Sequence, residues 1–147
     1  MSLKNLNASK KIHRFLLNKL KDKRTFHIYK KFETLLNIDE NFIVAVSGGP
    51  DSLALSALTK SYAYETKSKF YYVLVNHNLR VNSSSEASSV KKLLKKHKIS
   101  LAILNNKKTI KNNLQKQARE VRYNLLTSFC KQKKIFNQLQ EVKDINC

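Results

Sequence analysis

Glycine and proline are almost missing from this 147-residue chain, which has two glycines and one proline. Average usage would supply about ten glycines and about seven prolines at this length. All three residues stand together as Gly48-Gly49-Pro50. Because glycine permits and proline imposes unusual backbone conformations, their concentration indicates a sharp turn, where the main chain can approach a ligand closely.

Cysteines and long apolar runs are also scarce. The two cysteines, Cys130 and Cys147, lack the spacing of a metal site or a disulfide framework, so we expect neither thiol to have a functional role. No apolar run approaches the roughly 20 residues of a membrane helix, and residues 1–11 lack the apolar stretch of a secretory signal. We therefore expect a soluble, cytoplasmic protein that has no membrane partner.

Acidic residues are outnumbered by basic ones, 10 against 29, which gives a formal net charge of +19. Such a charge attracts polyanions, nucleic acid above all. The lysines, however, accompany abundant Asn, Ile, Phe and Tyr, a bias typical of A+T-rich coding sequence. Lysines spread by that bias also form an ordinary solvated surface, so both interpretations stay open.

Hydrophobic periodicity predicts a helical lead-in followed by an alternating α/β region. Helical spacing indicates one helix around residues 12–20 and a second at Ile28, Phe32, Leu35 and Leu36. Short apolar runs then predict three buried strands, and helical patterns follow each of them. The strands are expected at 42–46, 70–75 and 101–104, and the helices at 53–58, 83–97 and 114–129. This alternation predicts an α/β fold, a parallel sheet with helices on both faces.

The loop Ser47-Gly48-Gly49-Pro50-Asp51-Ser52 joins the first predicted strand to a helix. Its glycines can take positive φ and present bare amides, while Pro50 suits the first helical turn. The free N–H groups of that turn and the helix dipole favour a phosphate at the same place. Asp51 would repel phosphate unless it holds Mg²⁺ or caps amides, so we predict a metal-bridged polyphosphate. The alternative is a tight turn in which Asp51 and Ser52 merely cap the helix.

Two further motifs lie downstream of this loop. One is Val75-Asn76-His77-Asn78-Leu79-Arg80, and the other is Gln117-Ala118-Arg119 with Arg122-Tyr123. With the loop, they resemble the PP-loop ATP pyrophosphatases and, among these, the tRNA(Ile)-lysidine synthetase family. The resemblance implies a PP-loop, adenine nucleotide alpha hydrolase-like domain at residues 42–134. A helical extension, residues 1–41, would pack on it, and residues 135–147 would form a divergent tail.

The same resemblance implies roles for individual residues. ATP would be bound by Ser47, Gly48, Gly49, Pro50, Asp51 and Ser52, and Asp51 would also help to hold Mg²⁺. His77 and Arg80 would contact the nucleotide or substrate, although a loop histidine can be incidental. Arg119 and Arg122 would reach phosphate of ATP or of tRNA, and a solvent-facing position is the alternative for both.

The implied function is that of a ligase that modifies tRNA. Such an enzyme uses ATP to adenylate the wobble cytidine of the isoleucine tRNA with a CAU anticodon, and then attaches free lysine to form lysidine. Another PP-loop activity, tRNA thiolation or amide formation, is a first alternative. A basic RNA-binding module without catalysis is a second one.

One motif of the resembled family is absent. A His-x-Asp-Asp-x-x-Glu segment should follow the last helix, but residues 135–147 read IFNQLQEVKDINC. We therefore expect a truncated domain, the N-terminal part of an enzyme, left by a frameshift or by an early end of the gene model. A sheet of three strands would then have an exposed edge, and the chain alone would form no lysidine.

Overall fold

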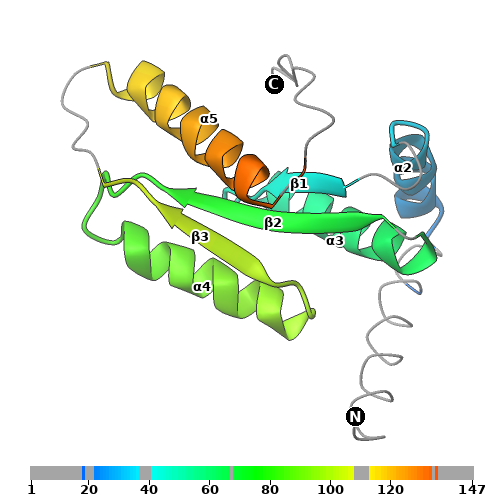
Figure 1. Ribbon diagram of the computed structural model, residues 1–147. Coiled ribbons are helices and arrows are strands. Elements are labelled where there is room, and N and C mark those ends of the chain that lie inside the picture. Colours follow the sequence, from blue (N-terminus) through cyan, green and yellow to red (C-terminus); the bar gives the residue numbers. More distant parts are fainter. Residues whose placement is uncertain are drawn as a thin grey trace, which may run out of the picture.

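The computed structural model describes residues 18, 22–36, 41–66, 68–107, 113–133 and 135. A helix precedes a regular alternation of strands and helices (Figure 1). The elements are α2 (Lys23–Glu33), β1 (Asn41–Ala45), α3 (Pro50–Glu65), β2 (Lys69–Asn76), α4 (Ser83–Lys96), β3 (Leu101–Asn105) and α5 (Leu114–Gln132). The helix predicted around residues 12–20, like the predicted tail, lies almost wholly outside the described residues.

The three strands form a parallel sheet in the order β1-β2-β3, as the alternating pattern predicts. Asn41 of β1 pairs with Lys69, the first residue of β2. Pairing of β2 with β3 begins only at Tyr72, opposite Leu101. Residues 69–71 of β2 therefore have β1 on one side and no partner strand on the other.

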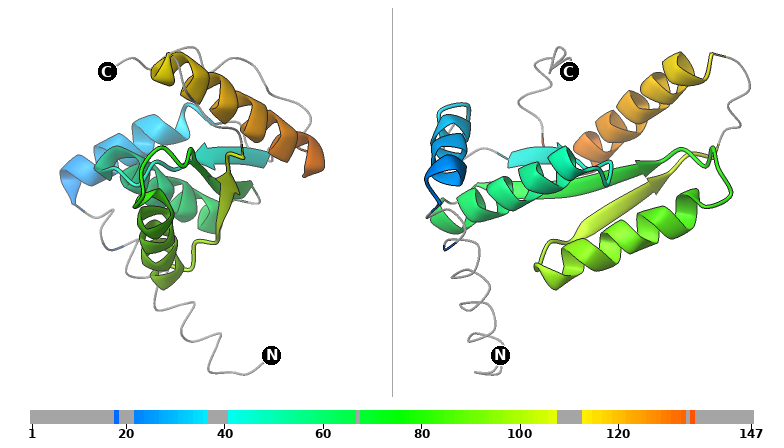
Figure 2. Two further views of the ribbon diagram at one scale, coloured as in Figure 1. Left: turned by 90° about the vertical axis from the view of Figure 1, so that its left-hand side faces the viewer. Right: turned by 180° about the vertical axis from the view of Figure 1, so that it is seen from behind.

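Helices cover both faces of the sheet, which confirms the predicted arrangement (Figure 2). Helices α3 and α4 pack on one face, because right-handed crossovers between neighbouring parallel strands place their helices on the same side. Helix α5 packs on the other face, where the rings of Tyr71 and Phe129 meet edge to face with centroids 6.4 Å apart. None of the described helices is both long enough and apolar enough to cross a membrane.

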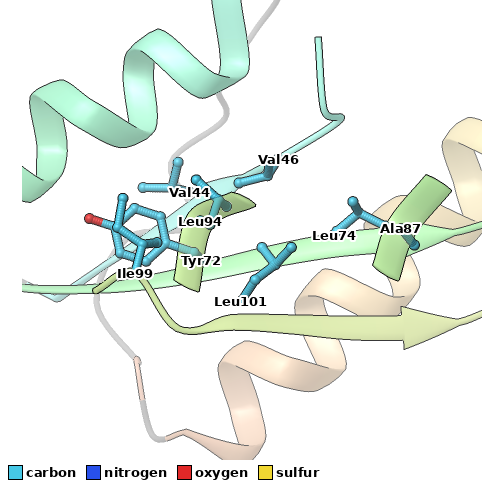
Figure 3. Packing of buried hydrophobic residues seen from close by; sticks show 8 residues of the cluster. All are labelled: Val44, Val46, Tyr72, Leu74, Ala87, Leu94, Ile99 and Leu101. Atoms are coloured by element: carbon cyan, nitrogen blue, oxygen red, sulfur yellow. The ribbon is translucent and has the colours of Figure 1, made fainter. Parts of the chain in front are cut away.

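The main core lies between the sheet and the α3–α4 layer (Figure 3). Its buried members are Val44, Val46, Tyr72, Leu74, Ala87, Leu94, Ile99 and Leu101. Alternate residues of β2 point to opposite faces, so Val73 lies on the α5 side, where it is fully buried. Burial on both faces explains why the strand sequences are continuously apolar.

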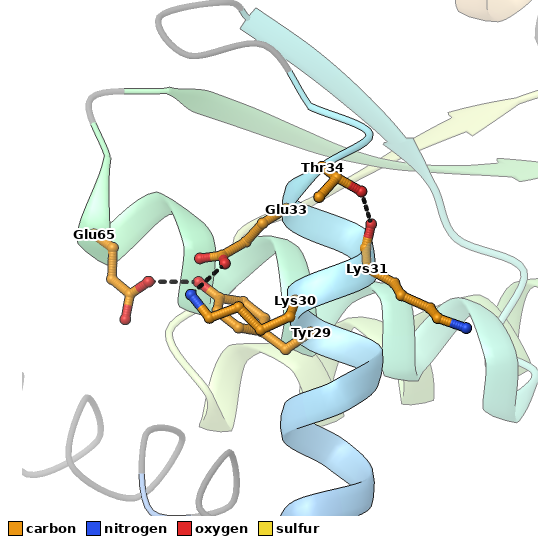
Figure 4. A network of polar contacts seen from close by, with 6 residues as sticks. All are labelled: Tyr29, Lys30, Lys31, Glu33, Thr34 and Glu65. Atoms are coloured by element: carbon orange, nitrogen blue, oxygen red, sulfur yellow. Dashed lines mark hydrogen bonds and ion pairs between the residues drawn. The ribbon is translucent and has the colours of Figure 1, made fainter.

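Helix α2 packs against α3 through a smaller cluster around Tyr29 and Tyr62. The Tyr29 hydroxyl donates a 2.7 Å hydrogen bond to Glu65 Oε2 at the end of α3, and Lys30 pairs with Glu33 next to this contact (Figure 4). The predicted apolar face was partly wrong, since Ile28 is 56% exposed and Leu35 is 80% exposed. The side of α2 that meets α3 is instead centred on Tyr29.

Candidate functional site

Gly48 and Gly49 of the 47–52 loop adopt different conformations. Gly48 has φ +89°, whereas Gly49 is extended, with φ −72° and ψ 164°. The sequence allowed positive φ at both positions, and the structure shows it only at Gly48. A Cβ on Gly48 would lie 2.7 Å from Cγ2 of Val90, but one on Gly49 would meet only Ser47 Oγ at 3.6 Å. Backbone conformation and close packing therefore both require glycine at position 48.

The Ser52 hydroxyl is the centre of the loop. Its oxygen accepts from the N–H groups of Ser47 and Gly48 and from the Ser47 hydroxyl, each at 3.2 Å. It donates to the carbonyl of Gly49 at 2.9 Å. Three donors thus share an oxygen that has two lone pairs, at distances longer than usual. These weakly satisfied donors are suited to an anion that offers several oxygens.

The N-terminus of α3 is not capped in the way that the alternative interpretation of the loop required. The first helical residue is Pro50, its N-cap is Gly49, and no side chain provides a capping hydrogen bond. Asp51 is exposed, and its carboxylate makes no hydrogen bond to any residue that the structure describes. Helix geometry leaves the amides of the first turn free, so the positive end of α3 faces the loop.

A cavity of about 480 Å³, here named the strand-end cavity, opens where β1 and β2 end. Its wall includes Ser47, His77, Arg80, Glu86, Val90 and Arg122. These side chains come from the loop, from the segment after β2, and from α4 and α5, which pack on opposite faces. Open α/β sheets bind ligands at this place, beyond the carboxyl ends of the strands.

His77 contributes an unused ring nitrogen to this region. Its Nδ1 is buried and has no hydrogen-bond partner. Burial, and secondly the positive charge of Arg122, lower the pKa of His77 below its ordinary value. The imidazole is therefore neutral at pH 7, and Nδ1 is available to a ligand as donor or acceptor, according to the tautomer.

The structure separates the two predicted arginines of α5. Arg122 lines the strand-end cavity, as Arg80 does. Arg119 does not line it, and its guanidinium lies over the ring of Tyr123, 5.6 Å from the centroid. Of the four residues predicted outside the loop, three therefore meet at this cavity.

An asparagine network, which was not predicted from the sequence, holds the ends of β2 and β3 together. Asn76 Nδ2 donates to Ser84 Oγ and to Asn105 Oδ1, each at 3.2 Å. Asn78 takes a left-handed φ of 54° and donates to the carbonyl of Asn106 at 2.9 Å. The Asn-x-Asn pattern after an apolar strand could have revealed it, because Asn tolerates left-handed backbone. The network fixes the turn that carries the cavity histidine.

Metal ligands are few at this site. Within the part of the chain that the structure describes, no three His, Cys, Asp or Glu side chains gather into a metal site. Mg²⁺ is commonly held by one or two carboxylates together with substrate phosphates and water. The carboxylate of Asp51 within the loop fits that mode of binding.

Several curated proteins are similar to this chain in sequence. The tRNA(Ile)-lysidine synthase of Orientia tsutsugamushi is 39% identical over 95 residues, which are 64% of this chain and 22% of that protein. The one of Wolbachia pipientis is 43% identical over 91 residues, 60% of this chain and 21% of that protein. The one of Rickettsia typhi is 36% identical over 112 residues, which are 70% of this chain and 26% of that protein. This chain thus spans about a quarter or less of these curated relatives.

Fold and family comparisons agree with each other. The U34-tRNA thiolase NcsA of Methanococcus maripaludis, solved with its [4Fe-4S] cluster, superposes with a TM-score of 0.57. The superposition includes 85% of this chain and 42% of the thiolase chain. The two sequences are 18% identical there, so the similarity is one of fold. Residues 18–141 match the family described as the PP-loop domain, which confirms the predicted family. This chain belongs to the PP-loop domain family.

Proposed function

We propose that this chain forms the ATP-binding part of a tRNA(Ile)-lysidine synthetase. The observation that carries the proposal is that Ser47, the first residue of the loop that leads into the uncapped N-terminus of α3, lines the strand-end cavity together with Arg80 and Arg122. The names of the relatives support the same activity. The chain spans only part of the length of those relatives. We therefore propose that this chain binds ATP and that the complete reaction requires an enzyme of the relatives' full length.

In this proposal, the loop and its helix bind the triphosphate of ATP. In the free loop, the N–H groups of Ser47 and Gly48 both donate to the Ser52 hydroxyl; when ATP binds, they donate to phosphate oxygens instead. The dipole of α3 stabilises the negative charge of the phosphates. Asp51 would hold Mg²⁺, which would supply positive charge to offset that of the leaving pyrophosphate. His77, Arg80 and Arg122 contact the nucleotide or the substrate from the far side of the cavity.

Adenylation solves a leaving-group problem. The carbonyl oxygen of the wobble cytidine attacks the α-phosphorus of ATP, and the bond to the β-phosphate oxygen breaks, releasing pyrophosphate. The amine of free lysine then attacks the activated ring carbon, loses a proton, and AMP departs with the former carbonyl oxygen. The substrate would be the isoleucine tRNA with a CAU anticodon, in the cytoplasm, and Arg119 would contact its backbone phosphate.

Binding of Mg-ATP by the purified chain tests the proposal. Isothermal titration should show that Asp51→Ala and Gly49→Ala each weaken binding about tenfold or more, because the first removes the metal ligand and the second puts a methyl group in the phosphate path. Gly49→Ala is informative because the free loop has room for its Cβ. Arg122→Gln should weaken binding, whereas Arg119→Gln, its matched control on α5, should not.

The competing RNA-binding module predicts the opposite pattern. It requires salt-sensitive binding of RNA, unchanged by Asp51→Ala and Gly49→Ala, together with no saturable binding of Mg-ATP. Another PP-loop activity would retain ATP binding but fail to adenylate a CAU-anticodon stem-loop once the chain is supplied with the rest of the enzyme. Equal Mg-ATP affinity in all four variants would overturn the proposal.

A further inference from the structure

A second cavity, of about 300 Å³, lies at the opposite end of the sheet. It is formed by Lys60 and Ala63 of α3 and by residues 68–72 at the start of β2, and we name it the amino-end cavity. The strand-end cavity lies beyond the other end of β2, whose eight residues span about 25 Å. None of the described residues lines both cavities, so the amino-end cavity is a separate site.

Ser68 brings a buried and unused hydroxyl to the amino-end cavity. The residue is 4% exposed, and its Oγ has no hydrogen-bond partner among the residues that the structure describes. A buried polar atom without a partner is unfavourable, and native structures contain few of them. A ligand that accepted a hydrogen bond from Ser68 would remove this defect.

The charges around this cavity have one sign. Lys60 and Lys69 line it, and none of the described residues that line it is Asp or Glu. Neither lysine forms an ion pair with any residue that the structure describes. Lys60 is only partly exposed, and its burial lowers the pKa of its ammonium group. An anion bound here would compensate the charge that burial makes costly.

The backbone of β2 is open along the same wall. Pairing with β3 starts at Tyr72, so residues 69–71 have no strand on that side. The carbonyl of Asn76 accepts from Asn106 N just past β3, and alternate residues direct their backbone groups to the same side. Phe70 therefore directs its N–H toward the open edge, which adds another donor.

From these features together, we propose that the amino-end cavity binds a phosphate group through Lys60, Ser68 and Lys69. The cavity is larger than a phosphate and reaches the lower limit of small-ligand sites, near 300 Å³. Phe70, Tyr71 and Tyr72 offer apolar surface to whatever carries that phosphate. The phosphate belongs either to a small phosphorylated molecule or to an RNA backbone, and the two sources can be distinguished.

Two-dimensional NMR of the chain, titrated with inorganic phosphate, uridine 5′-monophosphate and an octauridylate RNA, tests the proposal. We expect saturable shifts of the amides of residues 68–72 with each probe. Lys60→Gln should weaken binding about tenfold and Ser68→Ala about threefold. Lys92→Gln, which changes an exposed lysine of α4, should leave binding unchanged. Ser68→Ala removes an unpaired hydroxyl, so the variant should fold at least as well as the parent.

The source follows from competition between the probes. If uridine 5′-monophosphate displaces the RNA from residues 68–72 and binds more tightly than inorganic phosphate, the ligand is a small phosphorylated molecule. If the RNA binds much more tightly than the mononucleotide, with a salt dependence that Lys60→Gln reduces, the ligand is a backbone phosphate. The site does not depend on ATP binding, so Asp51→Ala should leave it intact. Absence of shifts at residues 68–72, or equal affinity in Lys60→Gln and Ser68→Ala, overturns the proposal.

Discussion

Two adjacent glycines meet different physical demands in the 47–52 loop. A side chain at Gly48 would be strained at φ +89° and would press on Val90, whereas Gly49 has an ordinary backbone and room for a Cβ. Substitution of Gly48 thus affects folding, and substitution of Gly49 affects only what approaches the loop.

We predict that Gly48→Ala lowers the free energy of unfolding by about 2–4 kcal/mol, the combined cost of left-handed strain and overpacking. Gly49→Ala should change it by less than about 1 kcal/mol. Urea unfolding followed by circular dichroism measures both values. Equal destabilisation by the two variants would contradict the loop geometry.

The pKa of His77 offers a second test at the scale of one residue. Its imidazole should titrate below the ordinary value of 6.5, because burial and Arg122 disfavour the charged form. Arg122→Gln removes the second cause and should raise the pKa of His77, though not to the ordinary value, since burial remains. NMR titration of the ring protons measures both pKa values.

The same shift makes stability depend on pH. The unfolded state gains the His77 proton near pH 6.5, and the folded state gains it only at lower pH. Between these two values the unfolded state binds more protons, so this histidine lowers stability as the pH falls. A pKa of His77 at or above 6.5 would contradict the burial of its ring beside Arg122.

At the scale of an element, helix α2 depends on one polar contact with α3. The Tyr29 side chain is buried, and its hydroxyl donates to Glu65 across the helix pair. Burial first, and the Glu65 carboxylate second, raise the pKa of Tyr29, so the phenol stays protonated. The Lys30–Glu33 ion pair lies next to this contact, and its Lys30 side chain is 56% exposed.

We predict that Tyr29→Phe lowers the free energy of unfolding by about 1–2 kcal/mol, since it removes a hydrogen bond to a charged acceptor. Lys30→Ala should cost less than about 0.5 kcal/mol, because exposed ion pairs contribute little. Hydrogen exchange should speed up in α2 only for Tyr29→Phe. Matching effects of the two variants would show that the buried contact does not hold the helix.

Helix α3 shows how an element can be recognised and yet misjudged in length. The apolar residues predicted a helix at 53–58, but α3 extends from Pro50 to Glu65. Its second half buries Thr59 and Ser61, whose hydroxyls donate to the carbonyls of Leu55 and Ala57 one turn earlier. Polar residues that satisfy themselves in this way can face a core, and no hydrophobic pattern reveals them.

At the scale of the whole molecule, β1 forms one edge of the sheet. Strand β1 pairs with β2, and among the described residues nothing pairs with its other edge, as expected for a sheet of three strands. An unpaired edge is a template for association with another strand. The division of the chain at residues 41 and 134 stays a prediction.

The net charge of +19 belongs to the same scale. We predict that RNA binding by the chain weakens at least tenfold between 50 and 200 mM salt, as it does for proteins that neutralise several phosphates. Asp51→Ala should leave this dependence unchanged, because general attraction to RNA does not use the loop. Fluorescence anisotropy with a labelled RNA measures it, and salt-independent affinity would show that the lysines form only a solvated surface.

Local features of the sequence by themselves determined the parallel α/β fold, the position of the 47–52 loop and the family. Apolar runs mark strands buried on both faces, and the clustered glycines and proline mark the turn, so both can be read from neighbouring residues. Only the tertiary structure decided that Arg122 and not Arg119 lines the strand-end cavity, and that Ser68 and Lys60 meet in a second one. Those outcomes depend on how α5 crosses the sheet and where β3 begins to pair, and such long-range packing leaves no local pattern.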